Sequence, residues 1–177
     1  MIQHDQVRFG VVGIGNIGSA HAACLARGAI EGGLLAALCD CDPAKAQLVR
    51  QQYPAVPFFD EAQALFASGL CDAVIISVPH RFHVPLGIAA LAQGLHVLVE
   101  KPMAGDMEQA REMLALEQPG GPVTMIAENF YYRKSVLTAA DWIQAGKIGA
   151  PTAALVQVLS HFPRDAKWLV ESDWRRD

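Results

Sequence analysis

The chain has 177 residues, 52% of them hydrophobic, and 18 acidic against 14 basic side chains give it a net charge of -4. This length suits one domain and the beginning of another, and the apolar fraction excludes a disordered chain. Because the lysines and arginines are scattered, nucleic acid is not an expected partner. No apolar run approaches the ~20 residues of a membrane-spanning helix, and the polar start Met1-Ile2-Gln3-His4-Asp5 does not resemble a signal peptide, so no membrane contact is expected.

Four cysteines are present, and their spacing does not indicate a metal site. Cys39 and Cys41 are too close together for a zinc knuckle, and no second Cys/His pair completes one. We expect Cys24, Cys39, Cys41 and Cys71 to be reduced thiols, which favours a cytoplasmic protein.

Short apolar runs alternate with stretches of helical pattern as far as Ala127. The runs are apolar throughout, which is typical of strands buried on both faces of a parallel sheet. The expected strands are Val7–Ile14, Leu34–Cys39, Pro57–Phe59, Ala73–Val78, His96–Val99 and Thr124–Ala127. The expected helices are Ile17–Arg27, Ala44–Gln52, Glu61–Phe66, His83–Ala92 and Met107–Glu117.

Capping residues support these helix limits. Asp42-Pro43 offers an N-cap followed by proline at the first helical position. Asp60 and Asp106 each precede a glutamine by three residues, which is the capping-box spacing. Gly94 follows the fourth helix where a C-terminal glycine is expected.

A glycine-rich turn lies directly between the first expected strand and the first expected helix. Its sequence, Gly13-Ile14-Gly15-Asn16-Ile17-Gly18, has the G-x-G-x-x-G spacing, and this context makes it a strong signal for dinucleotide binding. The first glycine permits a tight turn, the second lets the backbone approach a pyrophosphate, and the third lets helix and strand pack closely. The alternative is a glycine-rich turn without a ligand.

The sequence changes character at residue 129. The aromatic stretch Asn129-Phe130-Tyr131-Tyr132-Arg133 precedes an expected helix from Ser135 to Ala145 and an expected strand, Thr152–Leu159. We therefore predict an α/β protein: a Rossmann-type doubly wound parallel sheet over residues 1–128, and the first helix and strand of a second, α+β domain over 129–177. The uncharged 152–159 strand would pack on the first domain or pair with a second copy, giving self-association.

Asp40 ends the second expected strand, 22 residues after Gly18. A carboxylate at this spacing accepts hydrogen bonds from the adenosine ribose and repels a 2′-phosphate, so NAD is favoured over NADP. The alternative is that Asp40 only caps the next turn, a role that Asp42 could already fill.

Val78-Pro79-His80 and His83 follow the fourth expected strand. In this fold ligands bind beyond the carboxyl ends of the strands, so this loop is expected to face the cofactor. The alternatives are a structural histidine and a metal pair, but no third metal ligand is evident nearby.

Glu100-Lys101-Pro102 follows the buried strand His96–Val99. A charged pair at the end of a buried strand costs free energy unless the pair has a role in binding or catalysis. A lysine beside a nicotinamide could exchange a proton with a substrate hydroxyl. The alternative is a surface ion pair of Lys101 with Glu100, which would stabilise little.

These motifs together resemble the Gfo/Idh/MocA family of NAD(P)-dependent oxidoreductases, which act on sugars and polyols. The similarity includes Gly13–Gly18, residues 79–83, the segment 94–102 and residues 143–151. It implies that Lys101 is the catalytic lysine and that Asp40 selects NAD. The remaining residues that the resemblance places along the cofactor or at the substrate are Pro79, His80, His83 and Glu100, with Asn129 near the nicotinamide and Tyr131 to Arg133 near the substrate.

Family members continue for about another domain, with a glycine-rich segment that supplies an Asp and a His to the active site. This chain stops at Asp177, so we expect it to be truncated, to bind NAD and to catalyse hydride transfer poorly. Two alternatives stay open: a non-catalytic dinucleotide-binding module or sensor, and an NADP-linked reductase acting on a carbonyl that is not a sugar.

Overall fold

The computed structural model describes residues 6–157. The chain divides into two compact units, Met1–Ala127 and Glu128–Asp177. Across residues 6–157, the helices are too short or too polar for any of them to cross a membrane.

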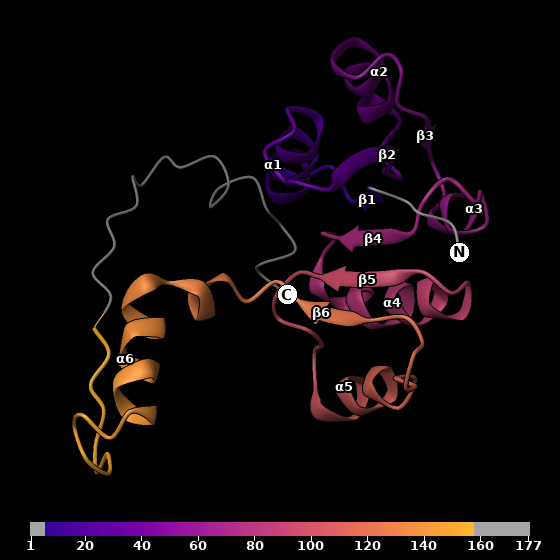
Figure 1. Ribbon diagram of the computed structural model, residues 1–177. Coiled ribbons are helices and arrows are strands. Elements are labelled where there is room, and N and C mark those ends of the chain that lie inside the picture. Colours follow the sequence, from indigo (N-terminus) through magenta and orange to yellow (C-terminus); the bar gives the residue numbers. More distant parts are fainter. Residues whose placement is uncertain (1–5, 158–177) are drawn as a thin grey trace. The chain divides into compact units, whose positions relative to one another are not determined.

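The first unit is built on a six-stranded sheet in the order β3-β2-β1-β4-β5-β6. All neighbouring strands are parallel, and their arrowheads end at one edge of the sheet (Figure 1). This order is that of a doubly wound Rossmann sheet, so the predicted fold class is confirmed. The strands are β1 (Val7–Val12), β2 (Gly33–Cys39), β3 (Phe58–Phe59), β4 (Ala73–Ile76), β5 (His96–Val99) and β6 (Thr124–Ile126).

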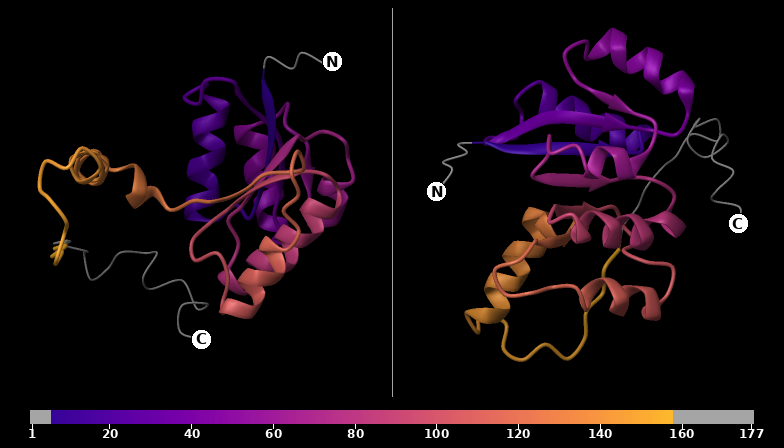
Figure 2. Two further views of the ribbon diagram at one scale, coloured as in Figure 1. Left: turned by 60° about the horizontal axis from the view of Figure 1, so that its bottom comes forward. Right: turned by 90° about the vertical axis from the view of Figure 1, so that its right-hand side faces the viewer.

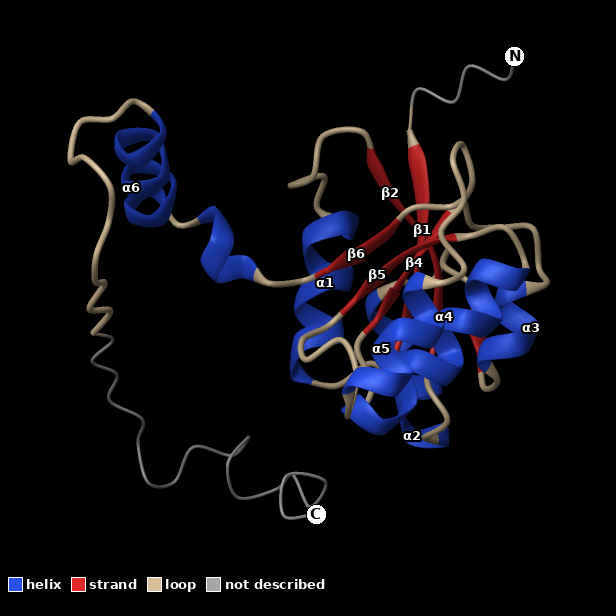
Figure 3. Cartoon of the chain, turned by 90° about the horizontal axis from the view of Figure 1, so that it is seen from below, coloured by secondary structure: helices blue, strands red, loops and turns tan. Residues whose placement is uncertain are grey.

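Helices cover both faces of this sheet, with α1 on one side and α3, α4 and α5 on the other (Figure 3). Figure 2 shows α4 and α5 side by side. This cover explains why the strands are apolar throughout rather than alternating. The helices are α1 (Asn16–Ala26), α2 (Pro43–Gln52), α3 (Ala62–Phe66), α4 (His83–Ala92) and α5 (Met107–Leu114), and a 3₁₀ turn, η1 (His80–Phe82), precedes α4.

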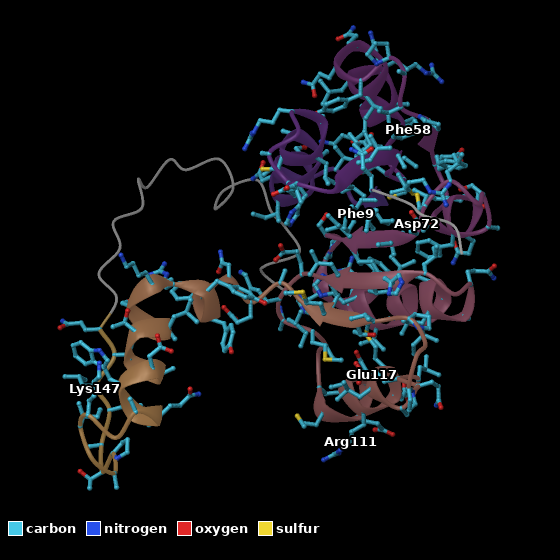
Figure 4. The ribbon with its side chains drawn as sticks, in the orientation of Figure 1. Phe9, Phe58, Asp72, Arg111, Glu117 and Lys147 are labelled. Carbon is cyan, nitrogen blue, oxygen red and sulfur yellow. The ribbon has the colours of Figure 1, made fainter. Side chains whose placement is uncertain are left out.

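Each face has its own hydrophobic core. Leu25 of α1 and Val49 of α2 pack on one face, where the partly buried rings of Phe9 and Phe58 complete the layer (Figure 4). Leu65, Phe66, Val84, Leu91 and Met113 pack on the other face. All four residues of β4 are buried, because this central strand lies between the two cores.

Most predicted caps are confirmed. The carboxylate of Asp42 accepts a hydrogen bond from the Ala44 N–H (2.9 Å), and that of Asp106 accepts one from the Gln109 N–H (2.9 Å). Gly94 has φ +77° just beyond α4, in the left-handed conformation that ends helices. The Asp60 cap is wrong: α3 begins one residue later than predicted, with Glu61 at its N-cap and no side-chain hydrogen bond.

Most predicted elements differ from the structure by one to three residues at an end; β4, for example, ends at Ile76 rather than Val78. Two of these differences have a clear local reason. β1 ends at Val12 rather than Ile14, because Gly13 turns the chain with φ +89°. α5 ends at Leu114 rather than Glu117, since the chain then tightens into short turns in which the Glu117 N–H donates to the Leu114 carbonyl.

The second unit contains a 3₁₀ turn, η2 (Asn129–Tyr132), and a helix, α6 (Lys134–Gln144), which ends before Gly146. The predicted strand Thr152–Leu159 is wrong over residues 152–157, where the backbone has no regular structure, and residues 158–159 lie outside the described range. A strand requires a hydrogen-bonded neighbour, and Leu155 and Val156 are instead 93% and 84% exposed.

All four cysteines are free thiols in the described structure. Burial raises the pKa of Cys39 to about 12 and that of Cys71 to about 11, and nearby carboxylates, Asp40 for Cys39 and Asp72 for Cys71, act in the same direction. These two thiols therefore stay protonated at neutral pH and behave as small apolar side chains.

Candidate functional site

The glycine-rich turn after β1 forms the floor of the candidate site. The Gly13 N–H donates to the Cys39 carbonyl (2.8 Å), and a Cβ on Gly13 would lie 2.8 Å from the Ser77 carbonyl oxygen. A Cβ on Gly18 would overlap the carbonyl oxygen of Gly13. Only glycine at both positions allows α1 to start this close to β1 and β4. The sequence analysis missed Ser77, whose hydroxyl donates to the Gly13 carbonyl (2.9 Å) and fixes the turn.

The start of α1 offers backbone donors to a ligand. Its N-cap, Gly15, has no side chain, and the amides of Asn16, Ile17 and Gly18 have no acceptor among the described residues. A Cβ on Gly15 would meet no atom within 4 Å. Open space beside exposed helix N–H groups is the arrangement that binds a phosphate, so this turn fits the pyrophosphate of a dinucleotide.

Asp40 connects this turn to the end of β2. One of its carboxylate oxygens accepts a hydrogen bond from the Ile14 N–H (2.6 Å), and the other accepts one from the Asp42 N–H (3.0 Å). The second contact is the turn-capping role that the sequence left open. A carboxylate has about four lone-pair positions, so further donors can still be accepted.

The loop after β4 contains Val78, Pro79 and the short turn η1, which begins at His80. His83, the first residue of α4, is 2% exposed. Its Nε2 lies 2.9 Å from the Val78 carbonyl oxygen and its Nδ1 lies 2.7 Å from that of Pro102. The imidazole therefore joins the loops after β4 and β5 and has no ring nitrogen left for a cofactor, which is the structural role that the sequence left open.

The segment after β5 carries the predicted catalytic lysine. Glu100 is anchored through its N–H, which donates to the Ile76 carbonyl (2.9 Å). The side chain of Lys101 is exposed beyond the sheet edge, as is Pro102. Lys101 is thus open to a ligand, while its own N–H donates to the Glu100 carboxylate (3.3 Å).

Glu100 pairs with a histidine that the sequence analysis did not identify. Its Oε1 lies 3.0 Å from Nε2 of His21 in α1. Burial by itself would raise the pKa of Glu100, but the His21 hydrogen bond and charge, together with the Lys101 N–H and charge, lower the pKa below its ordinary value. The available signal was a lone polar residue, His21, inside the otherwise apolar stretch 20–26. The alternative of a surface ion pair between the Lys101 and Glu100 side chains is not found among the described residues, where Glu100 forms a half-buried pair with His21 instead.

The residue predicted near the nicotinamide, Asn129, and the predicted substrate residues, Tyr131 and Arg133, belong to the second unit. Asn129, Tyr131 and Arg133 lie in or beside η2 and are exposed. The Arg133 guanidinium stacks 3.9 Å from the centre of the Phe130 ring, and Tyr131 contacts Tyr132 edge to face. These contacts lie within the second unit and order the aromatic stretch locally.

The first unit therefore brings together the glycine turn, Asp40, the loop after β4 and Lys101, because the strands before them end at the same sheet edge. No group of three or more His, Cys, Asp or Glu side chains that could hold a metal ion occurs among residues 6–157.

Comparison with known proteins agrees with this arrangement. A sequence model of an oxidoreductase family with an NAD-binding Rossmann fold, Gfo/Idh/MocA, matches residues 7–127. An uncharacterized oxidoreductase of Escherichia coli, YdgJ, is 32% identical over 160 residues, which cover 90% of this chain and 44% of that protein. Inositol 2-dehydrogenase of Corynebacterium glutamicum is 34% identical over 112 residues, covering 63% of this chain and 33% of that protein.

Solved structures show the same similarity. The scyllo-inositol dehydrogenase of Lactobacillus casei with bound NAD(H) and scyllo-inositol superposes with a TM-score of 0.75 at 26% identity, covering 81% of this chain and 42% of that one. The chain thus spans less than half the length of these relatives. With its family match over residues 7–127, its strand order and its glycine turn, the chain belongs to the Gfo/Idh/MocA family of oxidoreductases with an NAD-binding Rossmann fold.

Proposed function

We propose that the chain binds NAD at the carboxyl edge of its sheet and serves hydride transfer between the nicotinamide and a secondary alcohol of a sugar or polyol. The observation that carries this proposal is the open start of α1, where three backbone N–H groups lack acceptors and Gly15 leaves room for a pyrophosphate. Relatives named as inositol dehydrogenases supply the substrate class.

Asp40 favours NAD over NADP in this proposal. Two of its lone pairs hold the backbone of Ile14 and Asp42, and the others are available to ribose hydroxyls. Its negative charge would repel a 2′-phosphate at the same place.

Lys101 is the proposed catalytic residue. When bound, the nicotinamide supplies the hydride chemistry. Lys101 contacts the alcohol oxygen: its neutral amine would take up the hydroxyl proton as the carbonyl forms, and the resulting ammonium would return that proton in the reverse direction. Glu100, fixed by His21, sets the position of the Lys101 backbone. Pro79 and His80 would line the cofactor, with Asn129 near the nicotinamide and Tyr131 and Arg133 near the substrate.

A second candidate function is a dinucleotide-binding module without catalysis. It is favoured because the candidate cofactor cradle lies wholly within the first unit. Calorimetric titration with NAD⁺ tests binding, and absorbance of the reduced nicotinamide with a panel of polyols tests turnover. Binding with turnover supports the oxidoreductase, binding without turnover supports the module, and absence of binding refutes both.

A further inference from the structure

The half-buried pair of His21 and Glu100, to which only the positioning of the Lys101 backbone was assigned above, also carries charge beside the proposed cofactor site. The two side chains are 26% and 15% exposed, and Nε2 of His21 lies 3.0 Å from Oε1 of Glu100. The pair joins α1, whose N-terminus is the candidate pyrophosphate site, to the segment that carries Lys101. This pair therefore places a titratable charge between two parts of the same site.

The strand order indicates which half of a dinucleotide the pair would face. In a sheet of this order, the two mononucleotide halves lie over opposite sides of the reversal between β1 and β4. Asp40 marks the β2 side as the adenosine half. The nicotinamide half then lies over the ends of β4 and β5, where Glu100 follows β5 directly.

Charge distinguishes the two forms of the cofactor at this place. The oxidised nicotinamide ring is cationic and the reduced ring is neutral, so a nearby carboxylate favours the oxidised form. We propose that the His21–Glu100 pair sets the preference of the site for the oxidised over the reduced cofactor. This inference rests on the proposed NAD site.

His21 adjusts this preference without moving Glu100. A neutral imidazole with its proton on Nε2 and an imidazolium both donate to the carboxylate, so the hydrogen bond persists in either state. With neutral His21 the pair carries one negative charge, and with protonated His21 it carries none. Binding of the cationic ring is therefore stronger when the pair keeps its negative charge.

The effect of the pair must be distinguished from the effects of the other titratable groups at this sheet edge. They are Asp40 after β2, His80 and His83 after β4, and Lys101 after β5. Glu100→Gln removes the charge, and His21→Gln keeps a donor to Glu100 but cannot gain a proton. His96→Gln is the matched control, because His96 lies at the opposite end of β5, where it accepts the Val123 N–H.

The experiment is calorimetric titration of the full chain and these three variants with NAD⁺ and NADH. Glu100→Gln should lower the NAD⁺ to NADH affinity ratio by about fivefold, the order expected for one unit charge removed from a half-buried site. In His21→Gln the carboxylate charge remains, so the ratio should be no lower than in the parent chain, and His96→Gln should match the parent.

The outcomes distinguish this inference from the proposed function. If the parent chain binds neither form, the NAD site itself is wrong and the inference falls with it. If the parent binds and Glu100→Gln leaves the ratio unchanged, only the inference is wrong. Should Glu100→Gln fail to fold by circular dichroism, the His21→Gln titration decides, and an NAD⁺ to NADH affinity ratio below that of the parent chain in that variant overturns the role of the pair.

Discussion

Replacing Asp40 with alanine tests two roles of one carboxylate. The Asp40 carboxylate accepts hydrogen bonds from the Ile14 and Asp42 amides at 2.6 and 3.0 Å, and we propose that it also binds the adenosine ribose hydroxyls. Hydrogen bonds to charged groups contribute about 1.5–3 kcal/mol each, but Asp40 is half-buried and water replaces part of the loss, so we expect Asp40→Ala to lower the free energy of unfolding by about 2 kcal/mol.

Cofactor affinity should respond in two ways. Because the Ile14 turn loses its anchor, Asp40→Ala should weaken binding of both NAD and NADP. Because the repulsion of a 2′-phosphate disappears as well, the NAD to NADP affinity ratio should fall by about tenfold. Urea unfolding followed by circular dichroism measures the first effect, and calorimetric titration with both cofactors measures the second.

Asp42→Ala provides the matched control two residues away. It removes only the cap to the Ala44 N–H, which should cost about 1 kcal/mol of stability and leave the cofactor ratio unchanged. If Asp40→Ala destabilises the chain no more than Asp42→Ala does, the anchoring role is wrong. If the ratio is the same in both variants, the ribose role is wrong.

Three further predictions concern the turn, the lysine and the second unit. Gly15→Ala should fold normally, since its Cβ meets open space, but should lose NAD binding, whereas the control Gly105→Ala should bind NAD as the parent does. If calorimetry gives Gly15→Ala the same NAD affinity as the parent chain, the pyrophosphate does not bind beside Gly15. Lys101→Ala should change NAD affinity by less than about tenfold, and a larger loss would make it a cofactor anchor. Leu155→Ser should reduce self-association in sedimentation, and a monomeric parent chain would contradict this.

The sequence predicted the sheet well, because its signals are local. The apolar run after Leu95 predicted the observed limits of β5, and the G-x-G-x-x-G spacing predicted the tight turn between β1 and α1. The prediction of a strand at 152–157 failed because apolar, uncharged composition indicates a strand only where a neighbouring strand is present to pair with it.

The contacts within the site could not be read from local patterns. Ser77 to Gly13, His83 to Pro102 and His21 to Glu100 each join residues that lie far apart in the sequence. Their partners become neighbours only when the parallel strands align their carboxyl ends. A polar residue isolated in an apolar helix, such as His21, is the sequence signal that deserves more weight.

The central claim is that NAD binds at the start of α1, and amide NMR of the ¹⁵N-labelled chain tests it most directly. As NAD⁺ is added, the amide signals of Asn16, Ile17 and Gly18, whose N–H groups lack acceptors among the described residues, should show saturable shifts. Unchanged positions of these three amides at saturating NAD⁺, or shifts confined to other parts of the chain, would contradict NAD binding at the start of α1.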